Sequence, residues 1–125
     1  MPDGCNLCWP DHAEDAWESQ TRVRGKSLID ESHFHVTILA CSACRQQFVS
    51  VFTETIDWVD GEDPQYWSLM PITPTEAVIL TRDTPDETAL QKLGSDRRAL
   101  ERVFDKDDPQ PRVFWGRGLR VGPHD

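Results

Sequence analysis

Two neighbouring strands with a CxxC motif between them are predicted in the first half of the chain. Apolar and polar side chains alternate over residues 33–40 (HFHVTILA), with the period of two that marks a half-buried strand. Residues 47–56 show a similar alternation. Because Cys41-Ser42-Ala43-Cys44 separates the two segments at hairpin distance, we expect this motif in the turn that joins them.

Three further segments are predicted to be strands. Residues 20–29 (QTRVRGKSLI) alternate weakly around Gly25, and residues 66–72 (YWSLMPI) form a short apolar run after an acidic loop. Residues 112–121 (RVFWGRGLRV) fit a closing strand or hairpin at the end of the chain.

Two helix starts with the same chemistry follow the fourth predicted strand. Thr73-Pro74-Thr75-Glu76 and Thr84-Pro85-Asp86-Glu87 each place Thr at an N-cap, Pro at the first helical position and Glu three residues after the cap. The first helix is expected to end near Arg82. The second is expected to bend at Gly94-Ser95 and to resume with Leu100, Val103 and Phe104 on one side.

These elements predict an α+β fold in which an antiparallel hairpin sheet precedes a C-terminal helical part. The length of 125 residues fits one domain. Within it we expect a β part at 1–73, a helical part at 74–108 and a closing strand at 109–125. No uncharged run approaches the ~18 apolar residues of a membrane span, and the start of the chain does not resemble a secretory signal, so a cytoplasmic protein is expected.

The four cysteines form two CxxC pairs, Cys5/Cys8 and Cys41/Cys44, and no cysteine lies outside them. Two such turns brought together supply four sulfurs at the corners of a tetrahedron, the closed coordination of structural zinc. The pattern therefore favours one metal site. Disulfides, which cytosolic proteins seldom keep, and a redox CxxC pair remain as alternatives.

The two CxxC turns, the second in a hairpin, resemble a zinc ribbon, and their spacing resembles that of rubredoxins over residues 5–57. The resemblance implies that all four cysteines are metal ligands, with iron and electron transfer as the alternative to zinc. Ribbon knuckles usually carry Gly after the second Cys, whereas this chain has Trp9 and Arg45 there, which favours structural zinc. Residues 53–73 also resemble a segment of small bacterial proteins, without implying an activity.

The charge balance changes the expected partners. Thirteen Lys and Arg against 22 Asp and Glu give a formal charge of −9, which disfavours nucleic-acid binding. Five acids and no basic residue lie in 53–63, and we expect an acidic loop at 57–64, which Trp58 and Trp67 bracket. An acidic, Trp-edged surface would suit a basic protein segment, although a solvated loop or a cation contact has the same composition. The candidate partner surface comprises Asp57, Trp58, Asp60, Glu62, Asp63 and Trp67.

His33 and His35 lie two residues apart on one strand face and could bind a metal, although the solvent side of a strand carries the same pattern. The familiar catalytic motifs are absent, and four thiolates would leave no open metal position, so a non-enzymatic role is favoured. The sequence thus predicts a small zinc-binding protein that acts as an interaction or adaptor module, with a rubredoxin-like iron protein as the alternative.

Overall fold

The computed structural model describes residues 4–56, 58–59, 63–105 and 110–124. These residues are mostly β and form one six-stranded antiparallel sheet in which every strand pairs with the next along the chain. The strands are β1 (Arg22–Glu31), β2 (Phe34–Cys41), β3 (Gln47–Glu54), β4 (Gln65–Ile72), β5 (Arg98–Phe104) and β6 (Arg112–Arg117). Three short helices accompany them, α1 (Ala13–Trp17), α2 (Pro74–Arg82) and α3 (Glu87–Lys92).

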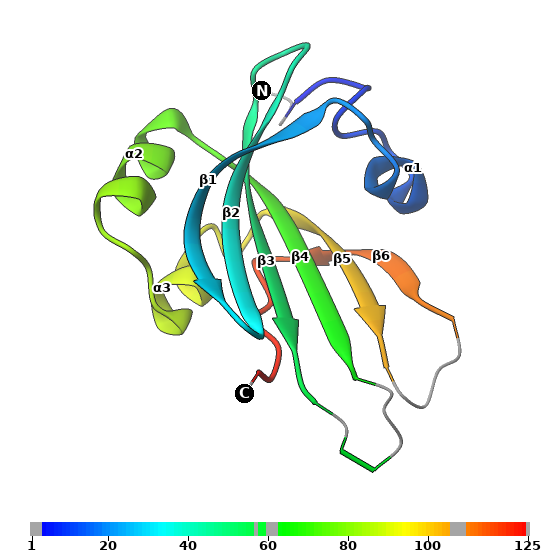
Figure 1. Ribbon diagram of the computed structural model, residues 1–125. Coiled ribbons are helices and arrows are strands. Elements are labelled where there is room, and N and C mark those ends of the chain that lie inside the picture. The colour runs from blue at the N-terminus through cyan, green and yellow to red at the C-terminus, as the bar shows by residue number, and fades with distance from the viewer. Residues whose placement is uncertain (1–3, 57, 60–62, 106–109, 125) are drawn as a thin grey trace.

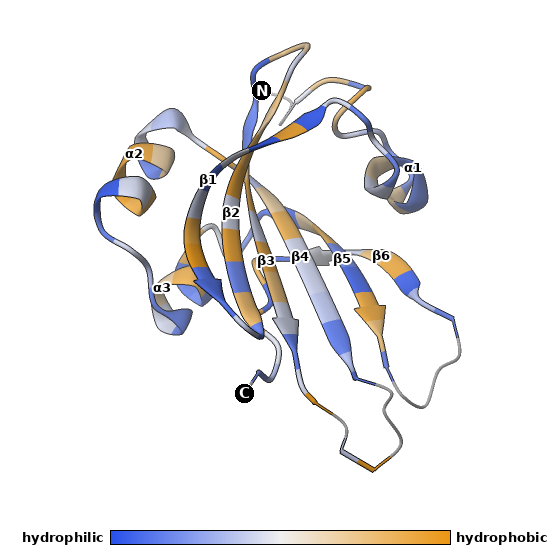
Figure 2. Ribbon diagram, viewed as in Figure 1, coloured by the Kyte–Doolittle hydropathy of each residue, from blue (hydrophilic) through white to orange (hydrophobic). Residues whose placement is uncertain are grey.

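The sheet is curved and its two faces are covered by different segments (Figure 1). Helices α2 and α3 cover one face, which we call the helical face. Its buried core combines β2, β3 and β4 side chains with Leu80 of α2, Leu90 of α3 and Leu119 after β6. Alternation along the strands, visible as changes of hydropathy in Figure 2, sends every second side chain into this core.

The N-terminal segment, residues 4–21, packs on the opposite face. We call this the N-terminal face. Trp9 lies between Phe48 and Trp115, with ring centroids at 5.1 and 4.9 Å. The Trp115 indole nitrogen donates a hydrogen bond of 2.8 Å to the Asp11 carbonyl oxygen. The N-terminal segment therefore buries this face of the sheet near the two CxxC motifs. Its helix, α1, has only five residues.

Five of the predicted strands are confirmed, but the predicted C-terminal helical part is wrong beyond α3. Residues 98–104 form β5 between β4 and β6, instead of continuing a helix. Leu100 packs in the core of the N-terminal face and Ala99 in that of the helical face, and Val103 is buried as well. Because β5 is covered on both faces, apolar side chains occur at odd and even positions and imitate a helical spacing. The helices are also not confined to the C-terminal part, since α1 precedes the first strand.

The helix starts were predicted with unequal success. Helix α2 begins after Thr73 with the expected capping box, and its Pro74 occupies the first turn. Helix α3 instead begins at Glu87, with the Asp86 carboxylate accepting a 2.8 Å hydrogen bond from the Ala89 amide. Thr84 is therefore not its cap. No helix among the described ranges is long and apolar enough to cross a membrane.

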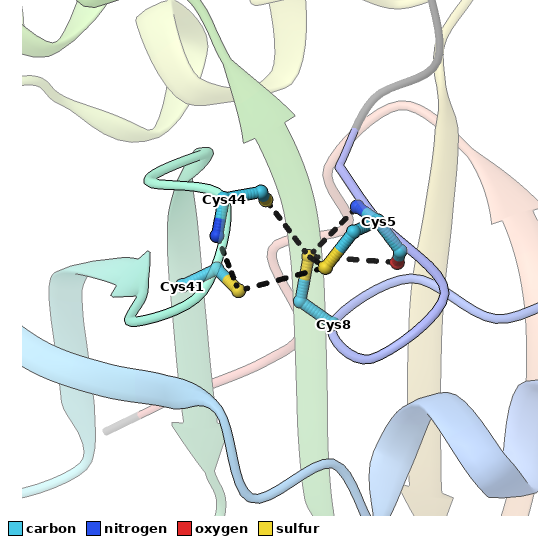
Figure 3. A group of neighbouring side chains, drawn as sticks. All are labelled: Cys5, Cys8, Cys41 and Cys44. Carbon is cyan, nitrogen blue, oxygen red and sulfur yellow. Dashed lines mark hydrogen bonds between the residues drawn. The ribbon is translucent and has the colours of Figure 1, made fainter.

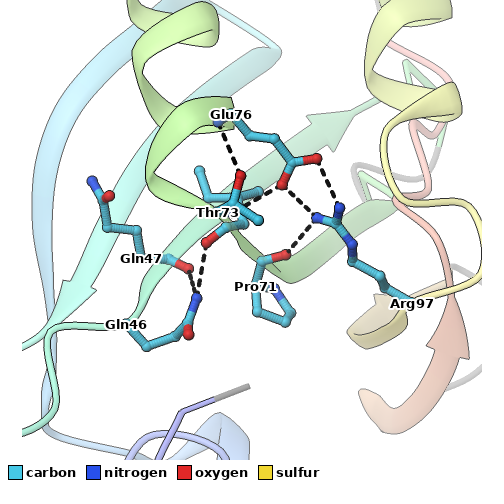
Figure 4. Close-up of polar contacts among 7 residues, drawn as sticks. Gln46, Gln47, Pro71, Thr73, Glu76 and Arg97 are labelled. Atoms are coloured by element: carbon cyan, nitrogen blue, oxygen red, sulfur yellow. Dashed lines mark hydrogen bonds and ion pairs between the residues drawn. The ribbon is translucent and has the colours of Figure 1, made fainter. Parts of the chain in front are cut away.

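Glu76 links the α2 capping box to the segment before β5 (Figure 4). Its carboxylate accepts the Thr73 amide at 2.8 Å and both Arg97 guanidinium nitrogens at 2.7 and 2.8 Å. The hydrogen bonds from Arg97 lower the Glu76 pKa from its ordinary 4.5, against the opposing effect of burial. A carboxylate with a lowered pKa stabilises the fold above its ordinary pKa, and this contribution is lost as the pH falls through the lowered value.

We expect Glu76→Gln to cost about 1–2 kcal/mol at neutral pH, because a bidentate ion pair becomes a single amide contact. Urea unfolding of both proteins at pH 7 and at pH 3 measures the difference. The difference should narrow at pH 3, because a lower pH shifts the wild-type carboxyl toward its protonated form, which cannot form the ion pair. A difference that is equal at both pH values would contradict an ionic contribution.

Candidate metal centre

Four cysteines from two distant segments meet at one end of the sheet (Figure 3). Cys5 and Cys8 lie in the loop before α1, Cys41 is the last residue of β2, and Cys44 lies in the turn before β3. The prediction that the second CxxC occupies the β2–β3 turn is confirmed. Cys8 and Cys41 are buried, whereas Cys44 is exposed, so the cluster lies at the edge of the core.

The sulfur atoms have the spacing of a tetrahedral metal site. The Cys5–Cys8 and Cys5–Cys41 sulfur pairs are 3.8 Å apart, and the Cys8–Cys44 pair is 3.7 Å apart. All four sulfurs lie within 4.8 Å of one another. A tetrahedron with metal–sulfur bonds of ~2.3 Å has edges of about 3.8 Å. Disulfide sulfurs would be ~2.05 Å apart, and the four cysteines are free. The cluster could therefore hold a metal ion.

The two CxxC turns have matching backbone hydrogen bonds. The Trp9 amide donates to the Cys5 carbonyl and the Arg45 amide donates to the Cys41 carbonyl, both at 2.8 Å. In the second turn the amides of Ala43 and Cys44 also point at the Cys41 sulfur, at 3.3 and 3.4 Å. Amide dipoles directed at sulfur favour its thiolate form, which is the form that binds a metal.

The thiol pKa values follow from these contacts. Burial raises the Cys41 pKa, but a hydrogen bond with the Thr21 hydroxyl and those from the Cys44 and Ala43 amides outweigh it and lower this pKa to about 6. Hydrogen bonds from the Cys8 and Leu7 amides lower the Cys5 pKa. Burial raises the Cys8 pKa above its ordinary value. The cluster thus combines two thiols with lowered pKa values, Cys5 and Cys41, with one thiol, Cys8, whose pKa is raised.

Arg22 is a basic residue that the structure places next to the first CxxC turn. Its guanidinium donates hydrogen bonds of 2.6 Å to the carbonyl oxygens of Cys8 and Ala16. Burial lowers the Arg22 pKa, while attraction to Cys8 and Cys41 opposes that shift. Arg22 therefore joins β1 to the first CxxC turn and to α1. Sequence reasoning missed this role because only the residue's place in a predicted strand was visible, not the segment folded over it.

The positions where ribbon knuckles usually have Gly differ in this chain, and one of them is strained. Arg45, which follows the second CxxC, has a φ of 68°, a left-handed conformation in which a side chain costs ~1–2 kcal/mol. Before the first CxxC, Gly4 has a φ of 108°, and a Cβ there would lie 2.7 Å from the Cys8 sulfur. The first turn thus needs glycine at its entry, and the second tolerates arginine at its exit.

Arg45→Gly should raise the free energy of unfolding by about 0.5–1 kcal/mol, since glycine adopts this conformation without the Cβ penalty. The matched control is Arg45→Ala, which removes the same exposed charge but keeps the Cβ. Urea unfolding of the metal-loaded proteins compares them. The explanation by strain fails if the alanine variant proves as stable as the glycine variant.

The other predicted site residues do not join the cluster. His33 Nδ1 lies 3.1 Å from a Glu54 carboxylate oxygen, and His35 Nδ1 lies 3.0 Å from an Asp30 oxygen. Within the described ranges, no second group of three or more His, Cys, Asp or Glu residues has metal-binding spacing. Each histidine thus has a carboxylate partner in place of a shared metal.

The candidate partner surface is described only in part. Trp58 lies in the β3–β4 loop with 88% of its surface exposed. Trp67 lies on β4 and packs against Phe52 and Trp17, with ring centroids at 4.9 and 5.8 Å. The two tryptophans that bracket the loop therefore have different surroundings. Asp63 is half-buried. Asp57, Asp60 and Glu62 lie outside the described residues.

Comparison of the chain with protein-family models, with the curated proteins and with the solved structures finds no match in any of the three. The function is therefore argued from the geometry of the site.

Proposed function

We propose that the protein binds one zinc ion through Cys5, Cys8, Cys41 and Cys44, and that the ion has a structural role. The observation that supports this most strongly is the sulfur spacing of 3.7–3.8 Å, which is that of a zinc tetrathiolate. A site with four protein ligands is closed, so no position is left for a substrate or a reactive water.

The structural role follows from which segments the cluster joins. Residues 4–21 precede the sheet and contain one short helix, α1, whose N-cap His12 makes no capping hydrogen bond through its side chain. A segment of this kind is marginal by itself, because an isolated short helix is unstable in water. A metal shared with the β2–β3 turn would hold this segment against the N-terminal face and so stabilise the core on that face of the sheet.

Iron in the same four thiolates, with electron transfer as the function, is the alternative. Zinc and iron make metal–sulfur bonds of similar length, so the spacing suits either ion. The arginine at the exit of the second turn, where ribbon knuckles usually carry glycine, favours structural zinc in our proposal.

Metal analysis of the protein as isolated separates the two. We expect a colourless protein with one zinc per chain. Its far-ultraviolet circular dichroism spectrum and its melting temperature should change when a strong chelator removes the ion. A red protein that bleaches on reduction would establish the iron alternative. A chain that carries no metal and melts unchanged with chelator would contradict both.

We further propose that the protein acts as an interaction module, with the β3–β4 loop receiving a basic segment of a partner protein. Trp58 and Val59 are each 88% exposed, and apolar side chains of this size are seldom left so open without a use. An arginine-rich peptide should quench the Trp58 fluorescence at low salt, and Trp58→Ala should remove that signal. Equal quenching by an acidic peptide of the same length would contradict the proposal.

A further inference from the structure

An open cavity of about 550 Å³ lies on the N-terminal face of the sheet, next to α1. Three aromatic side chains line it, Trp17 from α1, Phe52 from β3 and Trp67 from β4. Trp67 makes ring contacts with both of the others, at 5.8 and 4.9 Å. The cavity volume falls within the ~300–1,000 Å³ typical of small-molecule sites. The Arg102 guanidinium lies over the Trp17 and Trp67 rings, 5.1 and 4.8 Å from their centroids, and covers part of their surface.

The floor of this cavity carries two hydroxyl groups without partners. Thr37 and Ser50 are paired across β2 and β3, and both line the cavity. Neither hydroxyl makes a hydrogen bond within the part of the chain that the structure describes. Neither is a buried oxygen without a partner, since the one such oxygen among the described residues is Thr53 Oγ1, so water in the open cavity reaches both hydroxyls. Two neighbouring hydroxyls that line one cavity and make no hydrogen bond within the described chain are available to a polar group of a ligand.

The charge of the lining points to an anion. Arg22, Arg24 and His35 line the cavity, and none of its described lining residues is Asp or Glu, although the chain carries a formal charge of −9. Arg22 is already held by the carbonyl oxygens of Cys8 and Ala16. Arg24 has no ion pair with a described residue. It is thus the cation left for a ligand.

The geometry around Arg24 connects the charge to the hydroxyls. In the β1–β2 ladder Arg24 is opposite Leu39, and Thr37 lies two residues further along the same strand. Arg24, Thr37 and Ser50 therefore lie on neighbouring strands of the cavity wall, which Ser19, Leu39 and Leu69 line as well. Asp30 contacts the lining residue His35 at 3.0 Å and is itself largely exposed.

We propose that this cavity binds a small planar aromatic carboxylate. Its ring would lie against Trp17, Phe52 and Trp67. Its carboxylate would accept hydrogen bonds from the Thr37 and Ser50 hydroxyls and pair with the Arg24 guanidinium. The carboxylate would give both hydroxyls the hydrogen-bond partner that the described chain does not supply, and such charge-assisted hydrogen bonds are strong. None of the lining residues is a cysteine, although Arg22 lines the cavity and also donates a hydrogen bond to the Cys8 carbonyl oxygen.

Three probes with one ring system and different charge test the proposal on the full, metal-loaded chain. These are 2-naphthoate, the neutral 2-naphthamide and the cation 2-naphthylmethylammonium, titrated while two-dimensional amide NMR is recorded. We expect 2-naphthoate to bind at least about tenfold more tightly than either other probe and to shift the amides of 35–39 and 50–52. Equal binding of all three probes, or no binding of 2-naphthoate, would overturn the proposal.

Two variants locate the anion within the cavity. Arg24→Gln and Thr37→Val should each weaken 2-naphthoate binding by about tenfold. Arg24→Gln should leave the binding of the neutral 2-naphthamide nearly unchanged. Both should fold, because Arg24 is exposed and Val lacks the unpaired hydroxyl of Thr37. Arg82→Gln, at an exposed site on α2, is the matched control for total charge and should leave binding unchanged. If Arg24→Gln behaves like Arg82→Gln, the carboxylate does not bind where we place it.

Discussion

Replacing Cys41 with Ser is expected to abolish stoichiometric zinc binding and to lower the free energy of unfolding by at least about 3 kcal/mol. The zinc affinity of small structural sites corresponds to ~10–16 kcal/mol at neutral pH, and most of it depends on complete thiolate coordination. Cys41 has the largest expected effect because it is buried and receives hydrogen bonds from two amides. Serine can occupy its volume but is a poor zinc ligand at neutral pH.

The control is Ser42→Ala, which changes an exposed side chain in the same turn and keeps all four sulfurs. Thermal unfolding and zinc content should match the wild type for this variant. Removing zinc from the wild type with a chelator should reproduce most of the Cys41→Ser loss, and the variant should then respond little to chelator. An unchanged melting temperature together with chelator resistance in Cys41→Ser would exclude a structural role.

Phe48→Ala is expected to cost about 3–5 kcal/mol, the range for truncating a fully buried aromatic side chain. Phe48 has no exposed surface and carries the Trp9 ring on one side, with the Arg22 guanidinium 5.9 Å from its centroid. Because Trp9 follows Cys8 directly, the variant should also weaken zinc binding, which competition with a chromophoric chelator measures.

Leu90→Ala separates this coupling from a general loss of stability. Leu90 is equally buried, but it lies in α3 on the helical face, in the other core. Its truncation should cost ~2–5 kcal/mol and leave zinc affinity at the wild-type value while the protein remains folded. If both variants weaken zinc binding to the same extent, Phe48 has no special connection to the cluster.

The β2–β3 hairpin and its CxxC turn could be predicted because the necessary signals are local. Alternation over 33–40 and 47–56 defines two strands, and the motif between them has the length of a turn. The capping box at Thr73 was predictable for the same reason, since its two partners are three residues apart. The convergence of two CxxC motifs was predictable from cysteine chemistry and not from any pattern of strands.

Features that depend on distant packing could not be predicted in the same way. Helix α1 has five residues and no side-chain cap, so nothing local marks it. Strand β5 has apolar side chains on both faces, and its spacing is therefore ambiguous with that of a helix. The cavity is lined by residues of four strands and the N-terminal segment, and Arg22 becomes important only after that segment folds over it. Such features need the sheet order, which a single sequence does not state.

X-ray absorption at the zinc edge measures the coordination of the ion in the protein as isolated. Four sulfur neighbours at ~2.3 Å, with no nitrogen or oxygen in the first shell and one zinc per chain, are the predicted result. A first shell with fewer than four sulfurs, or a chain that holds no zinc, would contradict the four-cysteine centre.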